Sequence, residues 1–230
     1  MVNCLNSKNC LNNVPLFDVL SDEEKSYIHQ LVEQRSYKAK ESIYSPGQKA
    51  ASFHIIKSGK IRIYRLAENG KEQLIRVLNH GDFTGELALF KKGVYEAFAE
   101  TLEDSVICSI HHEDFKKMLL NYPKVATNML EVLANRLSTS EEQTAWVSTE
   151  TVQDRLLHFI AKTAYFKKGE VLVTLNFTKK ALASYLGTTP ESLSREWTKL
   201  EKLGIIKTVN KTTIKIVSLD IDINNNLFKK

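Results

Sequence analysis

Three spacings of hydrophobic residues follow one another along this chain, and each predicts a different kind of structure. Between residues 41 and 110, short β-branched and aromatic runs alternate with turns that contain glycine, which is typical of strands. Between 123 and 147, apolar residues recur every three or four positions, which predicts one long helix. After 178, two short amphipathic segments flank a glycine, which predicts two helices joined by a tight turn.

The glycine-rich part of the chain is predicted to form a small all-β domain. Its expected strands are 53–59, 60–66, 72–78, 97–101 and 105–110. Strands at this spacing favour a sandwich or jelly roll, and Asn69-Gly70 is the strongest hairpin signal. Ahead of this domain, Ser21 and Glu24 match a capping box and predict a helix that ends near Arg35.

The long helix that begins at Pro123 has a stripe of apolar and small residues on one side. Such a stripe fits a seam between two parallel copies of the helix. The predicted dimer contacts on this stripe are Leu130, Leu133, Leu137, Ser140 and Thr144. The alternative is a helix that packs only on its own β domain. Shorter helices are expected at 113–120 and 152–165, with a hinge at 148–151.

Two helices joined by a tight turn are predicted in the last third of the chain. Thr178 is suited to cap the first helix, and Gly187 is suited to end it. Thr189 is suited to cap the second helix, and Pro190 occupies its first turn, where the missing N–H has no consequence. The spacing therefore predicts a helix-turn-helix.

The second of these helices has one apolar and one polar face, with Leu193, Trp197 and Leu200 on the apolar side. The N-cap and the polar face supply the predicted DNA contacts, which are Thr189, Glu191, Ser194, Arg195, Thr198 and Lys199. Two β-branched runs, 205–209 and 213–217, follow directly and predict a hairpin wing. There are two alternatives to a DNA-binding helix-turn-helix. One is a helical hairpin with a solvated face, and the other is a module that binds another protein.

Charge is divided unevenly along the 230 residues. Residues 152–230 contain 14 Lys and Arg against 7 Asp and Glu, whereas residues 1–151 contain 18 against 20. Positive charge beside a helix-turn-helix indicates phosphate binding. The sequence has no run of 18 apolar residues and no signal peptide, so we expect a cytoplasmic protein without a membrane partner.

The order of the parts and two motifs resemble the CRP/FNR family of bacterial transcription regulators. One motif is GDFTGELALF at 81–90, which resembles the turn and short helix of the family's β-roll, and the other runs from Glu191 to Arg195. The resemblance implies an α+β fold with three parts. They are a sensor β-roll similar to cyclic-nucleotide-binding domains at 1–122, a dimerisation helix at 123–148 and a winged helix-turn-helix at 149–230. It also implies a homodimer that binds double-stranded DNA and RNA polymerase.

The resemblance also bears on the effector. The family's cyclic-nucleotide binders hold the ribose with a glutamate and the phosphate with an arginine-serine pair. Glu86 matches the glutamate, but Glu96-Ala97 stand in place of the pair, and a carboxylate repels a phosphate. Cyclic AMP is therefore not expected as the effector. The residues of the corresponding pocket are Gly85, Glu86 and Leu87. A regulator that senses a small molecule without redox chemistry is the main alternative.

Three cysteines resemble part of the set that holds the iron–sulfur cluster in FNR. Cys4 and Cys10 keep the spacing of two N-terminal ligands, and Cys108 falls where the distant ligand lies. Met1 stands where the remaining ligand would be. FNR-like proteins of Gram-positive bacteria with an incomplete set are similar to this chain, and some of them resemble thiol–disulfide switches. Three interpretations of the cysteines stay open: a disulfide, a cluster with a non-cysteine ligand, and residues that only pack. No cofactor is predicted.

The recognition helix also resembles that of FNR in its pattern of Glu191, Ser194 and Arg195. This resemblance implies TTGAT-like half-sites in an inverted repeat. Arg195 is suited to bind O6 and N7 of guanine, and Glu191 is suited to accept from a base amino group.

An enzyme of cupin type is the remote alternative. Such an enzyme would need histidines and a carboxylate clustered on strands. Of the six histidines, two are expected on helices, two are isolated, and His111 and His112 are neighbours that point in opposite directions after a strand. No nucleophile elbow or phosphate loop is present. The sequence therefore predicts neither a catalytic site nor a metal site.

Overall fold

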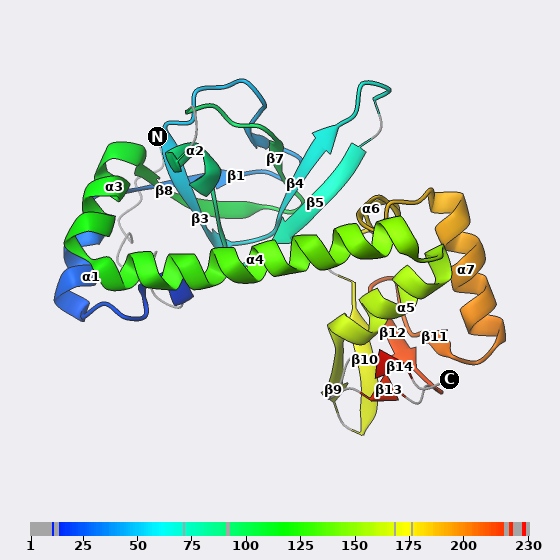
Figure 1. Ribbon diagram of the computed structural model, residues 1–230. Coiled ribbons are helices and arrows are strands. Elements are labelled where there is room, and N and C mark those ends of the chain that lie inside the picture. Colours follow the sequence, from blue (N-terminus) through cyan, green and yellow to red (C-terminus); the bar gives the residue numbers. More distant parts are fainter. Residues whose placement is uncertain are drawn as a thin grey trace. The chain divides into compact units, whose positions relative to one another are not determined.

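The structure is a computed structural model, and its elements are labelled in Figure 1. It describes residues 11, 14–70, 72–90, 93–167, 169–175, 177–218, 221–222 and 227–228. The chain divides into two compact units, Met1–Leu137 and Ser138–Lys230, and the boundary falls within the long helix α4 (Pro123–Thr149). Within the described ranges, no helix is long and apolar enough to cross a membrane.

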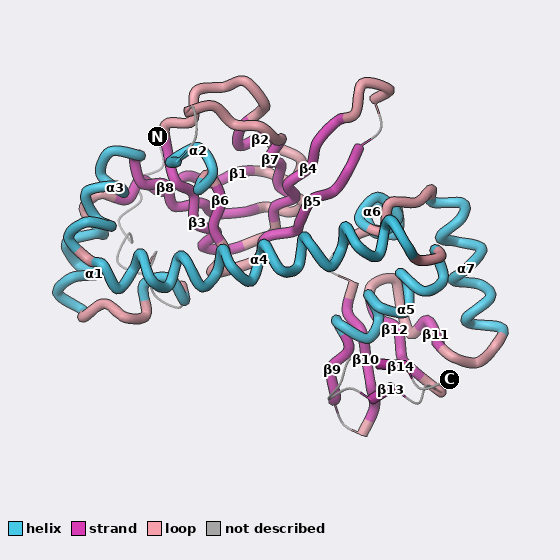
Figure 2. The backbone as a smooth tube through the Cα atoms, in the orientation of Figure 1, coloured by secondary structure: helices cyan, strands magenta, loops and turns pink. Residues whose placement is uncertain are grey.

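Two antiparallel sheets form the β-roll of the first unit (Figure 2). Among the described residues, the first sheet has the order β1 (Val32–Tyr37), β8 (Ser105–His111), β3 (Ser52–Ser58) and β6 (Phe83–Thr84). The second has the order β2 (Ser42–Tyr44), β7 (Phe98–Thr101), β4 (Ile61–Leu66) and β5 (Glu72–Leu78). The predicted jelly-roll domain is confirmed. Gly70, with φ +75°, lies in the turn between β4 and β5, as its hairpin signal predicted.

Strands β3 and β8 have buried residues on both faces of their sheet. Ile56 and Ile107 belong to a core shared with the second sheet. Phe53 and Ile110 belong to a different core, which also contains residues of α1 (Asp22–His29), α3 (His112–Asn121) and α4. Burial on two faces explains why β3 and β8 have nearly continuous hydrophobic runs. The helices predicted at 113–120 and from 123 are confirmed.

The helix predicted to end near Arg35 is shorter than expected. It does begin at the capping box, because the Ser21 hydroxyl accepts from Glu24 N at 3.2 Å and the Glu24 carboxylate accepts from Ser21 N at 2.7 Å. It ends at His29, and Val32 lies opposite Ile110 in the β1–β8 ladder. The predicted end is therefore wrong, because pairing with a distant strand outweighs the local apolar spacing.

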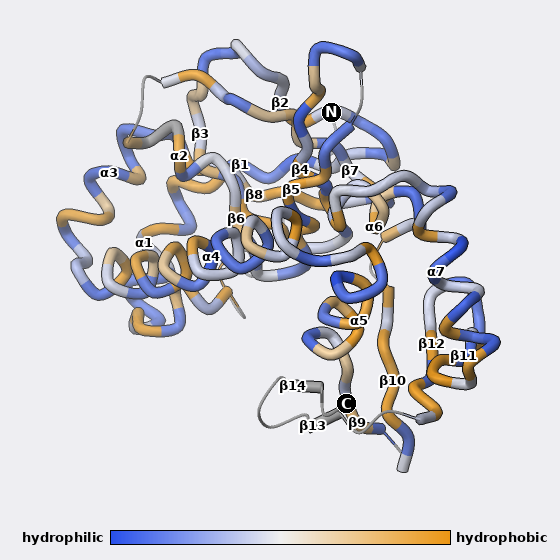
Figure 3. The backbone as a smooth tube through the Cα atoms, turned by 45° about the vertical axis from the view of Figure 1, so that its right-hand side comes forward, coloured by the Kyte–Doolittle hydropathy of each residue, from blue (hydrophilic) through white to orange (hydrophobic). Residues whose placement is uncertain are grey.

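The second unit is a winged helix-turn-helix, as predicted. Its elements are α5 (Val152–Thr163), β9 (Ala164–Lys167), β10 (Glu170–Thr174), α6 (Lys179–Tyr185), α7 (Pro190–Lys202), β11 (Ile206–Thr208), β12 (Thr213–Ile216), β13 (Ile221–Asp222) and β14 (Leu227–Phe228). One core joins α5, α6, α7 and the sheet. In Figure 3, much of β10 has the colour of hydrophobic residues. The helix predicted over 152–165 ends at Thr163 because Tyr165 pairs with Leu172 in the β9–β10 ladder.

Candidate functional site

Caps on α6 and α7 define the tight turn between them. The Thr178 hydroxyl accepts from Ala181 N and caps α6. The Thr189 hydroxyl accepts from Ser192 N and caps α7, and the donor–acceptor distance is 3.2 Å at both caps. Gly187 has φ +64°, a conformation that glycine adopts without steric cost, and it follows the C-cap of α6, Leu186. The capping residues predicted for this motif are confirmed.

The recognition helix α7 buries one face and exposes the other. Leu193, Trp197 and Leu200 are buried in the core of the unit. The exposed polar side chains of α7 around one shallow hollow are Glu191, Ser194, Arg195, Thr198, Lys199 and Lys202. Every DNA contact predicted on α7 therefore lies on its exposed face, and Thr189 is exposed at the N-cap. A helix with such a face is suited to the major groove.

Both signs of charge occur on this face. The pKa of Glu191 is lowered by hydrogen bonds from its own backbone N–H and from Thr189, and then by the positive charge of Arg195. Glu191 is therefore an ionised acceptor at neutral pH. Lys199 Nζ donates to the side-chain oxygen of Gln153 at 2.7 Å, so this predicted DNA contact also connects α7 to α5.

The wing is tied to the recognition helix through Trp197. Its indole Nε1 donates to Thr208 Oγ1 at 3.2 Å, and Lys179 Nζ lies 3.9 Å from the centroid of its ring. In the turn between β11 and β12, the side-chain oxygen of Asn210 accepts from Thr212 N at 2.9 Å. The predicted wing is therefore present, and one aromatic side chain connects α6, α7 and β11.

Helix α4 has a buried face and an exposed apolar face. Val125 and Met129 are buried in the core of the first unit. Leu130 and Leu137 are large and apolar, yet their exposed fractions are 66% and 59%. Leu133 packs partly against the core, so this predicted seam residue also stabilises its own unit. The other residues predicted for the seam are the exposed Ser140 and Thr144.

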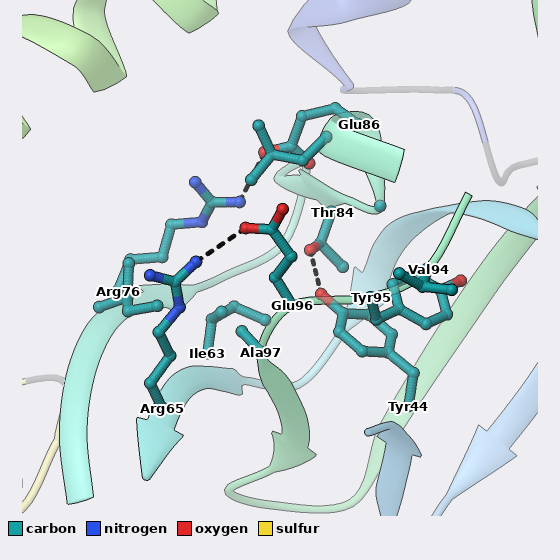
Figure 4. A pocket seen from close by; sticks show the side chains of 13 residues that line it. Tyr44, Ile63, Arg65, Arg76, Thr84, Glu86, Val94, Tyr95, Glu96 and Ala97 are labelled. Atoms are coloured by element: carbon teal, nitrogen blue, oxygen red, sulfur yellow. Dashed lines mark hydrogen bonds and ion pairs between the residues drawn. The ribbon is translucent and has the colours of Figure 1, made fainter. Parts of the chain in front are cut away.

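The predicted effector pocket surrounds Glu86 at the start of α2 (Glu86–Phe90) (Figure 4). Glu86 is 2% exposed, and its Oε1 accepts from Arg76 at 2.6 Å and from Arg136 of α4 at 3.0 Å. Arg136 also lies over the Phe83 ring, 4.1 Å from the centroid, and donates to the Phe83 carbonyl oxygen at 3.0 Å. Two arginines of the protein therefore bind the carboxylate that the sequence analysis assigned to the effector pocket.

The cavity beside Glu86 is small. It measures about 70 Å³, whereas pockets for small ligands usually measure ~300–1,000 Å³. Gly85 and Leu87 line it. Glu96 also lines the cavity and accepts from Arg65 at 2.9 Å (Figure 4). Because the Glu96 carboxylate would face a phosphate, these residues do not fit a cyclic nucleotide.

A buried histidine connects this cavity to β8. His54 is 8% exposed, with its Nδ1 2.8 Å from Ser109 Oγ and its Nε2 3.0 Å from the Tyr95 hydroxyl. Tyr95 lines the cavity and stacks on Tyr44, with the ring centroids 3.8 Å apart. Burial lowers the pKa of His54 to about 4, with a smaller contribution from the charge of His112. The His54 ring is therefore neutral at pH 7.

We expect acid to destabilise the β-roll through His54. An unfolded histidine has a pKa near 6.5, so between about pH 6.5 and 4 the unfolded state binds more protons than the folded state. The free energy of unfolding therefore falls as the pH falls through this window, by roughly 3 kcal/mol once His54 is fully protonated. Urea unfolding at a series of pH values should show a flatter profile for His54→Gln. The exposed His80, changed to Gln, is the control, and an unaltered slope in His54→Gln would contradict the assignment.

Cys108 on β8 is fully buried and disulfide-bonded. Met1, Cys4 and Cys10 lie outside the described residues, so the predicted cysteine set is placed only in part. A disulfide sulfur is not the thiolate that an iron–sulfur cluster needs, so Cys108 in this state does not fit a cluster ligand. Among the described residues, no group of three or more His, Cys, Asp or Glu is placed to hold a metal.

Some polar residues that shape these sites have no clear motif in the sequence. They are Arg76, Arg136, Gln143 and Arg155. The available signal for two of them is a charge on an otherwise apolar helix face. Arg136 follows Met129 on the inward side of α4, and Arg155 precedes the buried Leu156 in α5. Glu86, the partner of Arg76, lies 10 residues away on another element, and the partner of Gln143 lies 42 residues away, so no pattern within one element marks these two residues.

Comparisons with known proteins match both units. Residues 34–122 match the cyclic nucleotide-binding domain, and residues 154–221 match the Crp-like helix-turn-helix domain. The probable transcriptional regulator flp of Lacticaseibacillus casei is 34% identical over 200 residues, covering 86% of this chain and 90% of that protein. The fumarate and nitrate reduction regulatory protein of Vibrio cholerae is 26% identical, covering 84% of this chain and 78% of that protein. In fold, a CooA mutant from Carboxydothermus hydrogenoformans is similar with a TM-score of 0.75 and 22% identity, covering 90% of each chain.

Proposed function

Because this chain belongs to the CRP/FNR family of bacterial transcription regulators, we propose that it binds DNA as a homodimer at an inverted repeat with TTGAT-like half-sites. In this proposal, residues 1–122 sense the signal, 123–148 join the two copies and 149–230 bind DNA. RNA polymerase is the proposed protein partner of the regulator at a promoter.

The exposed face of α7 is the observation that carries this proposal. Arg195 presents the planar fork that binds O6 and N7 of guanine, and the ionised Glu191 accepts from a base amino group. The excess of Lys and Arg in residues 152–230 supports contacts with the phosphates on either side.

The exposed apolar face of α4 supports the dimer. An inverted repeat needs two recognition helices about 34 Å apart, and one copy of the chain supplies one of them. Leu130 and Leu137 lie seven positions apart, which is the spacing that pairs two parallel helices. A twofold axis along this seam gives both half-sites the same contacts.

We further propose that Cys108 makes the regulator sensitive to redox state. Two thiols that form a disulfide lose two electrons and two protons to an oxidant such as oxidised glutathione. The disulfide state of Cys108 supports this proposal. Cys108 also shares one core with Phe17 near the N-terminus and with Val125 and Met129 of α4. In this proposal, the disulfide of Cys108 acts through this shared core on the helix that carries the seam.

Arg195→Ala tests the proposed base contact. We expect binding to the inverted repeat to weaken by about 1–3 kcal/mol, with relaxed preference at the guanine, because a bidentate contact to a base is lost. Fluorescence anisotropy with a set of single-base variants of the site measures both effects.

Lys202→Ala is the matched control for Arg195→Ala, because Lys202 lies on the same exposed face near the end of α7. A lost phosphate contact should weaken binding to all sequences equally and reduce the salt dependence. The same uniform weakening in Arg195→Ala would make Arg195 a phosphate contact and would contradict its proposed role.

A further inference from the structure

The last carbonyl groups of α6 are bound by side chains from two other helices. Gln143 of α4 donates through its side-chain nitrogen to the Tyr185 carbonyl oxygen at 2.6 Å. Arg155 of α5 donates through Nη1 to the carbonyl oxygens of Leu186 at 2.5 Å and Gly187 at 3.5 Å. The end of a helix leaves such carbonyl groups without partners inside the helix and carries partial negative charge. These two side chains therefore cap α6 from outside the helix-turn-helix.

Arg155 is buried, and its hydrogen bonds hold it at the end of α6. Its exposed fraction is 9%, and its Nε donates to the Thr151 carbonyl oxygen at 3.4 Å. Among the described residues, its hydrogen bonds go to carbonyl oxygens, and no carboxylate forms an ion pair with it. A buried charge without a carboxylate depends on dipoles for stabilisation, and the carboxyl end of α6 supplies them. Movement of this helix end would leave the guanidinium without that stabilisation.

The turn after α6 has little free space beside α4 and α5. A Cβ atom added to Gly187 would lie 3.1 Å from Val147 of α4 and 3.3 Å from Arg155 Nη1. Only residues 186–189 separate α6 from α7, so a shift at the end of α6 passes directly to the start of the recognition helix. The last turns of α4 and the first turn of α5 therefore limit where α7 lies within this unit.

We propose that Gln143 and Arg155 are positioning residues for DNA recognition, through which the final turns of α4 set the orientation of α7. The proposal rests on the proposed DNA-binding function and adds the residues that control it. Neither side chain is proposed to contact DNA. Their loss should reduce discrimination between DNA sequences and leave attraction to phosphates unchanged, because phosphate contacts tolerate small changes of orientation better than base contacts do.

The test compares specific with non-specific binding by the full-length protein. An operator is first selected from random duplexes with the wild-type protein, so that the test does not depend on a TTGAT-like site. Gln143→Leu and Arg155→Met keep similar volumes and remove the donors. We expect each to reduce the ratio of operator affinity to random-duplex affinity at least tenfold. Random-duplex affinity and its salt slope should stay within twofold of the wild type.

Two further variants show whether the donors matter rather than the general packing of α4 on α5. Arg155→Lys keeps the charge and a donor group but not the planar fork, so it should restore part of the ratio. Glu142→Gln is the matched control, because Glu142 lies beside Gln143 and forms an ion pair with Lys162 of α5, and an ionised carboxylate has no donor for the carbonyl groups of α6. It should leave the ratio unchanged.

The outcomes are distinct. An unchanged ratio in both donor variants would overturn the proposal, and so would an equal loss of both affinities that parallels a lower melting temperature. If Arg155→Met fails to fold, the partly exposed Gln143 still decides the matter, because its loss leaves the core intact. A wild-type protein that selects no sequence would refute the proposed function itself.

Discussion

Leu137→Glu is expected to give a folded monomer that binds its operator at least 100-fold more weakly. Leu137 is 59% exposed and belongs to the stripe of α4 assigned to the dimer seam. In a dimer, two new carboxylates would face each other across that seam, and like charges at close range repel. The loss follows from losing one of two linked half-site contacts, whose linkage is worth ~10²–10⁴ in affinity. Sedimentation measures the mass, and fluorescence anisotropy measures the affinity.

Asn135→Glu is the control for this change. Asn135 is exposed on α4 two positions before Leu137 and lies outside the stripe, so the dimer should persist. Leu133→Glu is less informative, because Leu133 also packs against the core of its own unit and its loss would destabilise the fold. A Leu137→Glu protein that stays dimeric, or a monomer that keeps the wild-type affinity, would contradict the seam.

The helix-turn-helix was fully predictable because its signals are local. Caps at Thr178 and Thr189, the left-handed Gly187 and the proline that opens α7 all lie within a few residues of the structures they determine. The exposed and buried faces of α7 follow from helical spacing alone. The same holds for the start of the first helix at Ser21, where the capping box is complete within four residues.

Features that depend on distant partners were not predictable in this way. The first helix ends before Val32 because that residue pairs with Ile110. The residues near Val32 in the sequence contain no signal for this pairing. Glu86 matches a ligand-binding motif, yet Arg76 and Arg136 bind it from β5 and α4. The motif identifies the residue type at this position. Only the folded structure shows that two arginines already bind the Glu86 carboxylate.

Reduction of the Cys108 disulfide is expected to loosen the N-terminal segment and to weaken operator binding at least tenfold. A pairing of Cys108 with either remaining cysteine would close a loop of roughly 100 residues, which stabilises a folded state by ~4–5 kcal/mol in chain-entropy estimates. Part of this stabilisation should reach α4, because Phe17 shares a core with Val125 and Asn128 donates to the Pro15 carbonyl oxygen at 3.3 Å. The oxidised protein should therefore bind DNA more tightly than the reduced protein.

The measurement is a titration of operator DNA with protein treated with dithiothreitol or with oxidised glutathione, both without added metal. Cys108→Ala is the control, because alanine removes the sulfur without burying a hydroxyl in the apolar core, and its affinity should be the same in both treatments. Iron and sulfide analysis of protein purified without oxygen separates a disulfide from a cluster. If the wild-type affinity is equal in both treatments and no iron is found, Cys108 contributes only to packing, because the protein then has no redox response to transmit through α4.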